Sequence, residues 1–221
     1  MVWLDQALEG RATAALWTGP AGLVAPMSYR RHKNLDIACK ASLQRGLPVR
    51  LRRSGGGLVP QGPGILNLSL AYPCNGSPGD LAEPVYHDLC AVLIRALSRL
   101  GIECRAHSVV GSFCDGRFNL AVTSQGIARK IAGTAQYWRR GNGRQAVLAH
   151  ALLLVDADPV HLSEQANRFE AALESGRRYD ANALTSVARC WQAEHPGIAL
   201  SSVFFTTVRR HIAESLIHQP N

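Results

Sequence analysis

Two side chains, Cys114 and Lys130, have the types and spacing to do covalent chemistry together. Cys114 lies in a turn of small residues (111–120) just ahead of a predicted strand. A reactive cysteine needs partial exposure and a positive setting, because the thiolate is the form that attacks. A hairpin predicted around Ser124-Gln125-Gly126 would bring Lys130 back towards Cys114. The pair predicts a nucleophilic site, although most lone cysteines are inert.

Lysine is scarce in this chain, which makes Lys130 informative. Of 24 basic residues only Lys33, Lys40 and Lys130 are lysines, and Arg129 directly precedes Lys130. Arginine is therefore the default wherever only positive charge is needed, and a primary amine on a flexible stem differs from a fixed guanidinium fork. The alternative to a functional amine is that Lys130 is a solvated lysine on an edge strand.

A glycine run, Gly55-Gly56-Gly57, follows a predicted strand that ends in Arg52-Arg53. Consecutive glycines let the backbone approach a ligand closely and point its N–H groups inward. A bare triple glycine can equally be a flexible turn. No GxxxxGK[ST] motif occurs, so the run does not indicate a P-loop.

The elements that must position these residues alternate between strands and helices. The spacing predicts strands over 14–17, 22–25, 48–53, 65–72, 102–106, 118–123, 127–132 and 145–155, and helices over 35–45 (with Asn34 as N-cap), 85–100 and most of 159–216. Residues 73–84 are expected to be a loop, and 139–144 a basic turn around Asn142-Gly143. This order predicts an α+β fold with mixed or antiparallel sheets flanked by helices. We expect one catalytic domain over 1–221, with 159–221 as its helical C-terminal part.

Bulk properties narrow the class of protein. The chain has 221 residues, 47% hydrophobic and 18% charged, which is not the composition of a disordered chain. There is no apolar run of membrane-spanning length and no basic, apolar leader, so neither a membrane span nor a secretory signal is expected. Six cysteines without CxxC spacing favour free thiols in a reducing cytoplasm, with no metal site.

Five segments occur in an order and spacing that resembles one enzyme superfamily. They are Arg53-Ser54-Gly55-Gly56-Gly57, Gly64-Ile65-Leu66-Asn67-Leu68-Ser69, Lys130-Ile131-Ala132-Gly133-Thr134-Ala135-Gln136, the His150 strand that ends in Leu152-Leu153-Leu154, and Leu184-Thr185-Ser186-Val187. Together they resemble the lipoate-protein ligase and octanoyltransferase superfamily, with the biotin/lipoate protein ligase-like catalytic fold. Residues 112–120 most resemble the lipoyl amidotransferase branch.

The resemblance implies roles for particular residues. Cys114 would form a thioester with an octanoyl or lipoyl group, and Lys130 would hold the acyl carbonyl. Gly55, Gly56 and Gly57 would line the acyl tunnel. The other substrate-binding positions it implies are Arg53, Ser54, Asn67, Gly133, Thr134, Ala135 and His150. A transferase of this kind needs no cofactor besides the lipoate- or octanoate-derived group that it moves.

The runner-up is an ATP-dependent lipoate-protein ligase, which would use ATP with Mg²⁺ and in which Lys130 would contact a lipoyl-adenylate. Ligases of the superfamily usually carry a further C-terminal domain, and the residues after about 159 are too few for one. Residues 58–64 also lack the superfamily's usual acidic stretch. Donor, acceptor, oligomeric state and the choice between octanoyl and lipoyl stay open.

The net charge of +8 suggests an acidic partner. In the transferase reading the partners are acidic lipoyl-domain proteins or acyl carrier protein, and Arg139 with Arg140 is a candidate contact. The charge and its arginine pairs could also suit nucleic acid, but no nucleic-acid-binding motif accompanies them, so this alternative is disfavoured.

Overall fold

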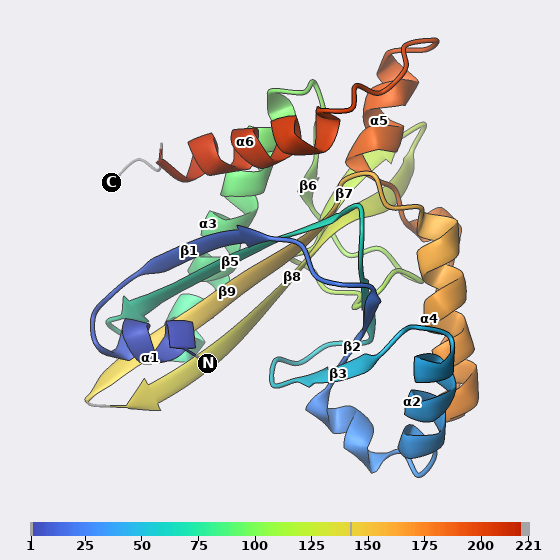
Figure 1. Cartoon of the computed structure of the whole chain (residues 1–221). Helices are drawn as coiled ribbons and strands as arrows, with labels where there is room; N and C mark the ends of the chain where they lie inside the picture. Colours follow the sequence, from blue (N-terminus) through green and yellow to red (C-terminus); the bar gives the residue numbers. More distant parts are fainter. Residues whose placement is uncertain (1, 142, 218–221) are drawn as a thin grey trace.

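The computed structural model describes residues 2–141 and 143–217, and its centre is a six-stranded antiparallel sheet (Figure 1). The strand order is β1-β5-β9-β8-β7-β6. The strands are β1 (Thr13–Trp17), β5 (Ile65–Cys74), β6 (Arg105–Ala106), β7 (Leu120–Ser124), β8 (Ile127–Gly141) and β9 (Arg144–Leu154). The α+β class with antiparallel pairing and flanking helices is confirmed.

The long strands β5 and β9 present two buried faces. On β5, Leu66 and Leu68 point into one hydrophobic cluster, whereas Ile65 points into another on the opposite side. The alternation in the sequence therefore predicted the faces correctly, but both faces are covered.

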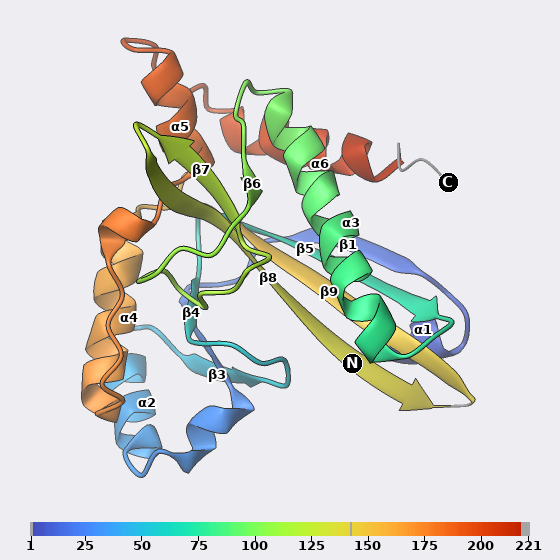
Figure 2. The same cartoon turned by 180° about the vertical axis from the view of Figure 1, so that it is seen from behind.

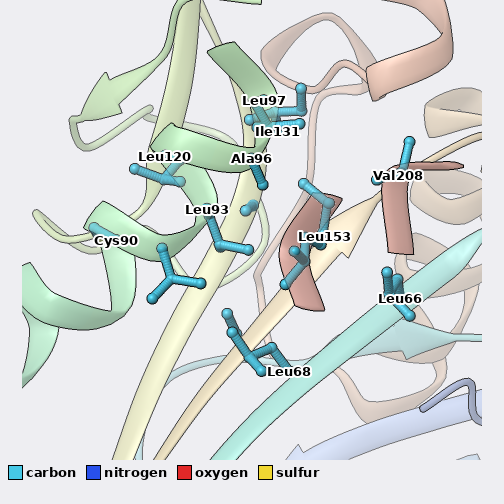
Figure 3. Packing of buried hydrophobic residues seen from close by; sticks show 14 of the residues in the cluster. Leu66, Leu68, Cys90, Leu93, Ala96, Leu97, Leu120, Ile131, Leu153 and Val208 are labelled. Atoms are coloured by element: carbon cyan, nitrogen blue, oxygen red, sulfur yellow. The ribbon is translucent and has the colours of Figure 1, made fainter. Parts of the chain in front are cut away.

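Helices α3 (Pro78–Ser98) and α6 (Phe204–Ile217) cover one face of the sheet, as Figure 2 shows. Figure 3 shows Leu93 and Leu97 of α3 and Val208 of α6 around Leu153 of β9. The loop expected over 73–84 is wrong. Strand β5 continues to Cys74, and α3 begins at Pro78 because the Ser77 side chain caps Asp80 N–H and proline fits a first helical turn.

A second, three-stranded sheet lies across the other face of the main sheet. Its order is β3-β2-β4, with β2 (Gly22–Pro26), β3 (Val49–Arg52) and β4 (Val59–Gln61). Helices α2 (Leu35–Gln44) and α4 (Pro159–Leu173) pack beside each other next to this sheet (Figure 1). Strand β4 was missed because Pro60 and the surrounding glycines resemble a loop. Asn34 is the N-cap of α2, but its side chain makes no capping hydrogen bond.

Two strand predictions needed correction in length. The strand expected over 102–106 is only Arg105–Ala106. The strand expected over 127–132 runs on to Gly141, so most of the expected basic turn over 139–144 is sheet instead. Its Asn142 lies outside the described residues. The hairpin at 124–126 is confirmed, with positive φ at Gln125 and Gly126.

The N-terminal helix α1 (Val2–Leu8), the short helices η1 (Met27–Arg31) and η2 (Ala181–Ala183), and α5 (Val187–Glu194) complete the fold. Residues of α5 and α6 belong to the same buried cluster as the central sheet. Within 2–141 and 143–217, no helix is both long enough and apolar enough to cross a membrane.

Candidate active site

A bulge in β8 aims Lys130 at the site. Leu120 pairs with Ala132, but the next residue, Ala121, pairs with Lys130, so Ile131 is the extra residue. Ile131 and Ala132 both enter the core against α3, and Lys130 turns to the other face. The backbone carbonyl of Lys130 accepts a hydrogen bond from Thr185 N–H (2.9 Å), which explains why the 184–187 segment accompanies the site.

The Lys130 ammonium is buried and holds the loop that carries Cys114. Its Nζ donates to the carbonyl oxygens of Phe113 and of Cys114 (3.2 Å), which leaves one N–H to donate elsewhere. Burial lowers the pKa of Lys130 to about 8, while the charges of Cys114 and Asp115 act in the opposite direction. The ammonium is therefore still mostly protonated at neutral pH.

The Cys114 loop is held in a left-handed conformation. Cys114 has φ of 50°, unusual for a residue with a side chain and typical of functional sites. Asn119 Nδ2 donates to the Cys114 carbonyl (2.8 Å), and Asn119 Oδ1 accepts from Thr134 N–H (3.3 Å). Thr134 Oγ1 also donates to the Phe118 carbonyl (2.8 Å). Strand β8 thus fixes the loop at several points.

Arg52 holds the glycine run through hydrogen bonds. Its guanidinium donates to the carbonyls of Gly55 (2.9 Å), Gly57 (2.7 Å) and Val24 (2.9 Å), and its Nε donates to Ser54 Oγ (3.1 Å). Desolvation lowers the pKa of Arg52, and the negative charge of a Cys114 thiolate raises it. The two side chains therefore interact electrostatically. An arginine remains charged even so.

The middle glycine of the run touches the cysteine sulfur. A Cβ on Gly56 would lie 2.2 Å from Cys114 Sγ, and the φ of Gly56 is 99°. Only glycine fits this position. Cys114 therefore lies against the glycine run, with Arg52 and Lys130 as neighbouring cations.

A buried carboxylate ties the two loops together. Glu170 is fully buried, and its Oε1 accepts from the hydroxyls of Tyr29 (2.6 Å) and Tyr179 (2.9 Å). The Tyr29 oxygen accepts from Leu58 N–H (3.2 Å), directly after the glycine run. The Tyr179 ring packs on Phe113, directly before Cys114, at 4.8 Å between centroids. Glu170 thus positions both sides of the cysteine.

A mainly apolar cavity of about 530 Å³ opens beside Cys114 and Lys130. It lies between the two sheets, and its walls include Gly133 and Ala135 of β8, Leu152 of β9 and Leu23 of β2. A cavity of this size and lining suits an apolar chain with a polar end at the cysteine.

His150 is a buried polar group on the cavity wall. Its Nδ1 lies 2.9 Å from Ser69 Oγ, which accepts from Trp17 Nε1–H (3.0 Å). Burial, and secondarily the charge of Arg52, lower the pKa of His150 to about 4, so the ring is neutral at physiological pH.

The structure brings most of the predicted site residues together. Those that line the main cavity are Arg53, Ser54, Cys114, Lys130, Gly133, Thr134, Ala135 and His150. Gly55 and Gly56 line a second, smaller cavity instead, and Gly57 lies against Cys114 N, Arg177 and Tyr179. The three glycines thus lie next to the cysteine.

Asn67 lies behind the cavity wall. It is fully buried and makes two amide hydrogen bonds with Gln61, at 2.9 and 3.0 Å. Gln61 is the member of the pair that lines the cavity. Asn67 therefore joins the two sheets, and any role in substrate binding would act through Gln61.

The second cavity, of about 270 Å³, meets the main one at Cys114. Both cavities are lined by Cys114, Thr134, Ala135 and Gln136. The second is also bounded by Tyr86 of α3 and by Asp115. Cys114 is therefore reachable from two compartments.

Two further observations concern metal binding and the arginine pair of β8. In the part of the chain that the structure describes, no group of three or more His, Cys, Asp or Glu side chains is arranged to hold a metal ion. Arg139 and Arg140 lie near the far end of β8 from Lys130, and Arg139 pairs with Asp5 at 2.6 Å.

Three positioning residues were missed by the sequence argument. Arg52 adjoins the predicted run and Asn119 lies within the predicted cysteine motif, so their polar side chains next to glycine and cysteine were a usable signal. Glu170 gave no usable signal in the sequence, because a glutamate within an amphipathic helix resembles a surface residue until its partners from other elements are known.

A mixed fold whose apolar cavity ends at a paired cysteine and lysine defines a class of domain that holds an acyl-like chain. The comparisons agree: residues 6–192 match the model of the lipoyl protein ligase A/B catalytic domain. The chain belongs to this family.

Two relatives and one solved structure illustrate the match. An uncharacterized protein of Cupriavidus necator is 48% identical over 96% of this chain and 88% of its own length. An octanoyl-[GcvH]:protein N-octanoyltransferase of Kyrpidia tusciae is 40% identical over 64% of this chain, and the match spans only 49% of that relative. The bipartite lipoate protein ligase of Thermoplasma acidophilum shares the fold, with a TM-score of 0.61, 17% identity, and coverage of 98% of this chain and 79% of that one.

Proposed function

We propose that this protein transfers an octanoyl or lipoyl group to a lysine of a lipoyl-domain protein through a thioester on Cys114. The observation that carries the proposal is the placement of Cys114. It lies at the end of an apolar cavity, near Arg52 and Lys130, with its sulfur against Gly56. The name of the Kyrpidia relative, an octanoyl-[GcvH]:protein N-octanoyltransferase, supports the same chemistry.

In the first step the Cys114 thiolate attacks the acyl carbonyl of the donor. The C–S bond forms, and the remaining N–H of Lys130 stabilises the oxyanion. The bond between the acyl carbon and the donor then breaks, and the donor group takes a proton from solvent as it leaves. In the second step the acceptor amine attacks the thioester, the C–N bond forms, and Cys114 leaves as thiolate. The main cavity holds the alkyl chain throughout.

Acceptors and location belong to the same proposal. The net charge of +8 suits an acidic lipoyl domain or acyl carrier protein. All six cysteines are free, which fits a reducing cytoplasm. The transfer needs no nucleotide.

The second candidate is an ATP-dependent lipoate-protein ligase with Mg²⁺. It is favoured by the fold shared with the Thermoplasma ligase, and in it Lys130 would contact an acyl-adenylate while Cys114 would be dispensable.

The test compares two reactions with purified protein and a lipoyl-domain acceptor. One contains octanoyl-[GcvH] without ATP, and the other contains free octanoate with ATP and Mg²⁺. The proposal predicts acceptor octanoylation only in the first, lost in Cys114→Ala and retained in Cys190→Ala, another free cysteine. Octanoylation only in the second reaction, unchanged in Cys114→Ala, would establish the ligase instead.

A further inference from the structure

The second cavity at Cys114 has a lining unlike that of the main cavity. Its side chains include Tyr86, Asp115, Arg117 and Asn119. It lies at the edge of β8 that β7 leaves free beyond Ala132, beside Tyr86 of α3, whereas Gly133 of β8 lines only the main cavity. An acyl chain in the main cavity would therefore leave this second approach to the thioester open.

Asp115 is the only acidic side chain in the lining of this cavity. It is exposed, directly follows Cys114, and forms no ion pair with any side chain of the described residues. The cation of the lining, Arg117, is already engaged by Glu83 (2.9 Å) and lies 4.6 Å over the Phe118 ring. The charge of Asp115 raises the pKa of Lys130, but the exposed carboxylate has no ion-pair partner among the described residues and can receive a further cation.

A carboxylate next to the nucleophile is not explained by the first step of the reaction, since negative charge gives a neighbouring thiolate no support. The second step explains it. The acceptor side chain arrives as a lysine ammonium, a cation that a carboxylate can hold beside the thioester.

We propose that the second cavity is the entry site for the acceptor lysine, and that Asp115 binds its ammonium beside the Cys114 thioester. This rests on the function proposed above. The nitrogen loses one proton to solvent before attack and a second after the C–N bond forms. The C–S bond breaks, and the sulfur leaves as thiolate next to Lys130 and Arg52.

Transfer between two lysines is symmetric, so a donor lysine must leave from the site that an acceptor lysine enters. Asp115 therefore acts on both half-reactions when the donor is an octanoyl-lysine amide. Asp115 has no ammonium to bind when the donor is a small thioester such as S-octanoyl-N-acetylcysteamine, which carries no amine at the reacting group.

The experiment first loads the protein with that thioester and then adds one of two small nucleophiles, Nα-acetyl-lysine methylamide or hydroxylamine. The first is cationic at neutral pH and the second is neutral, and neither needs protein docking. Decay of the acyl-enzyme is followed by intact mass in wild type, Asp115→Asn and Asp88→Asn. Asp88 is an exposed acid of α3 outside both cavities and matches the charge change.

Once loaded, Asp115→Asn should show a ratio of the lysine-derivative rate to the hydroxylamine rate about tenfold below that of wild type, because any effect of Asp115 on Lys130 is common to both nucleophiles. Asp88→Asn should match wild type with both nucleophiles. Equal ratios for wild type and Asp115→Asn would overturn the proposal while leaving the Cys114 thioester intact. Failure of wild type to load would instead contradict the proposed function itself, and this proposal with it.

Discussion

At the residue scale, the contact between Gly56 and the Cys114 sulfur leaves no room for any side chain. We predict that Gly56→Ala slows acylation of Cys114 about a hundredfold, because the added Cβ would lie 2.2 Å from Sγ and φ is positive. The acylation rate is measured by mass spectrometry during loading from S-octanoyl-N-acetylcysteamine. Gly55→Ala is the matched control, since a Cβ there meets nothing within 4 Å and should leave loading near wild type. Equal losses in both variants would mean that the run acts only through flexibility.

His150 links the cavity wall to acid stability. Its pKa is lowered from 6.5 to about 4 in the folded protein, so between these values the unfolded chain binds a proton that the folded protein does not. Stability should therefore fall as pH drops from about 6.5 towards 4, with His150 contributing up to about 3 kcal/mol.

Urea unfolding of wild type and His150→Gln at pH 7 and pH 4.5 isolates this contribution, because all other groups are common to both. The variant should lose less stability than wild type on acidification. Parallel losses would show that the imidazole is accessible to protons in the folded protein.

Cys114 and Lys130 were predicted from residue type and spacing, and His150 from the resemblance of its strand to the superfamily. The structure places all three on the main cavity, and their roles stay predictions. The left-handed φ of Cys114 was not predicted, since it depends on Asn119 and Lys130 bonding to its carbonyl from β7–β8.

At the scale of elements, the glycine run and the cysteine loop come from distant parts of the chain and meet through Glu170 of α4. We predict that Glu170→Leu lowers the rate constant of Cys114 acylation, because both tyrosine hydroxyls lose their acceptor and the two loops shift. Glu170→Gln, which keeps an acceptor oxygen, should recover much of the rate.

The time course separates positioning from folding. A positioning defect lowers the rate constant at full acylation amplitude, whereas partial unfolding lowers the amplitude and leaves the rate constant unchanged. Ser163→Ala is the control, because Ser163 is also buried on α4 and its Oγ has no hydrogen-bond partner among the described residues. If Glu170→Leu lowers only the acylation amplitude and not the rate constant, Glu170 contributes to folding and not to positioning.

The elements themselves were predictable where hydrophobic periodicity was strong, as in α3 and in the alternating faces of β5. The errors fall where tertiary contacts decide. Strand β4 forms around Pro60 because it pairs with β2, and β8 continues past Ala132 because β9 pairs with it to Gly141.

At the scale of the whole molecule, basic side chains occur in many segments, and two of these regions are candidate contacts for an acidic acceptor. Arg177 borders the glycine run, since its Nη1 lies 3.3 Å from where a Gly57 Cβ would be, and the exposed Arg178 follows it in the chain. Arg139 and Arg140 lie at the far end of β8.

We predict that Arg178→Glu slows octanoyl transfer to a lipoyl domain several-fold at low salt, with a smaller difference at high salt, and leaves loading from the small thioester unchanged. Arg140→Glu should have little effect on either reaction. This departs from the sequence-based expectation for Arg139 and Arg140, because the pair lies at the far end of β8 from Lys130. The opposite ranking would place the acceptor at the far end of the sheet.

The overall class was within reach of the sequence, because five motifs in order fix an α+β acyl-transfer fold more firmly than any one alone. The packing of the small sheet over the large one, and hence the cavity between them, needed the structure. It depends on the buried Gln61–Asn67 pair and on apolar contacts from both sheets.

The most direct test of the central claim is intact mass spectrometry of the protein after incubation with octanoyl-[GcvH] and no ATP, in wild type, Cys114→Ala and Cys39→Ala. The account predicts one hydroxylamine-labile octanoyl group on wild type and Cys39→Ala, and none on Cys114→Ala. An adduct that persists in Cys114→Ala, or one that resists hydroxylamine, would contradict Cys114 as the acyl carrier.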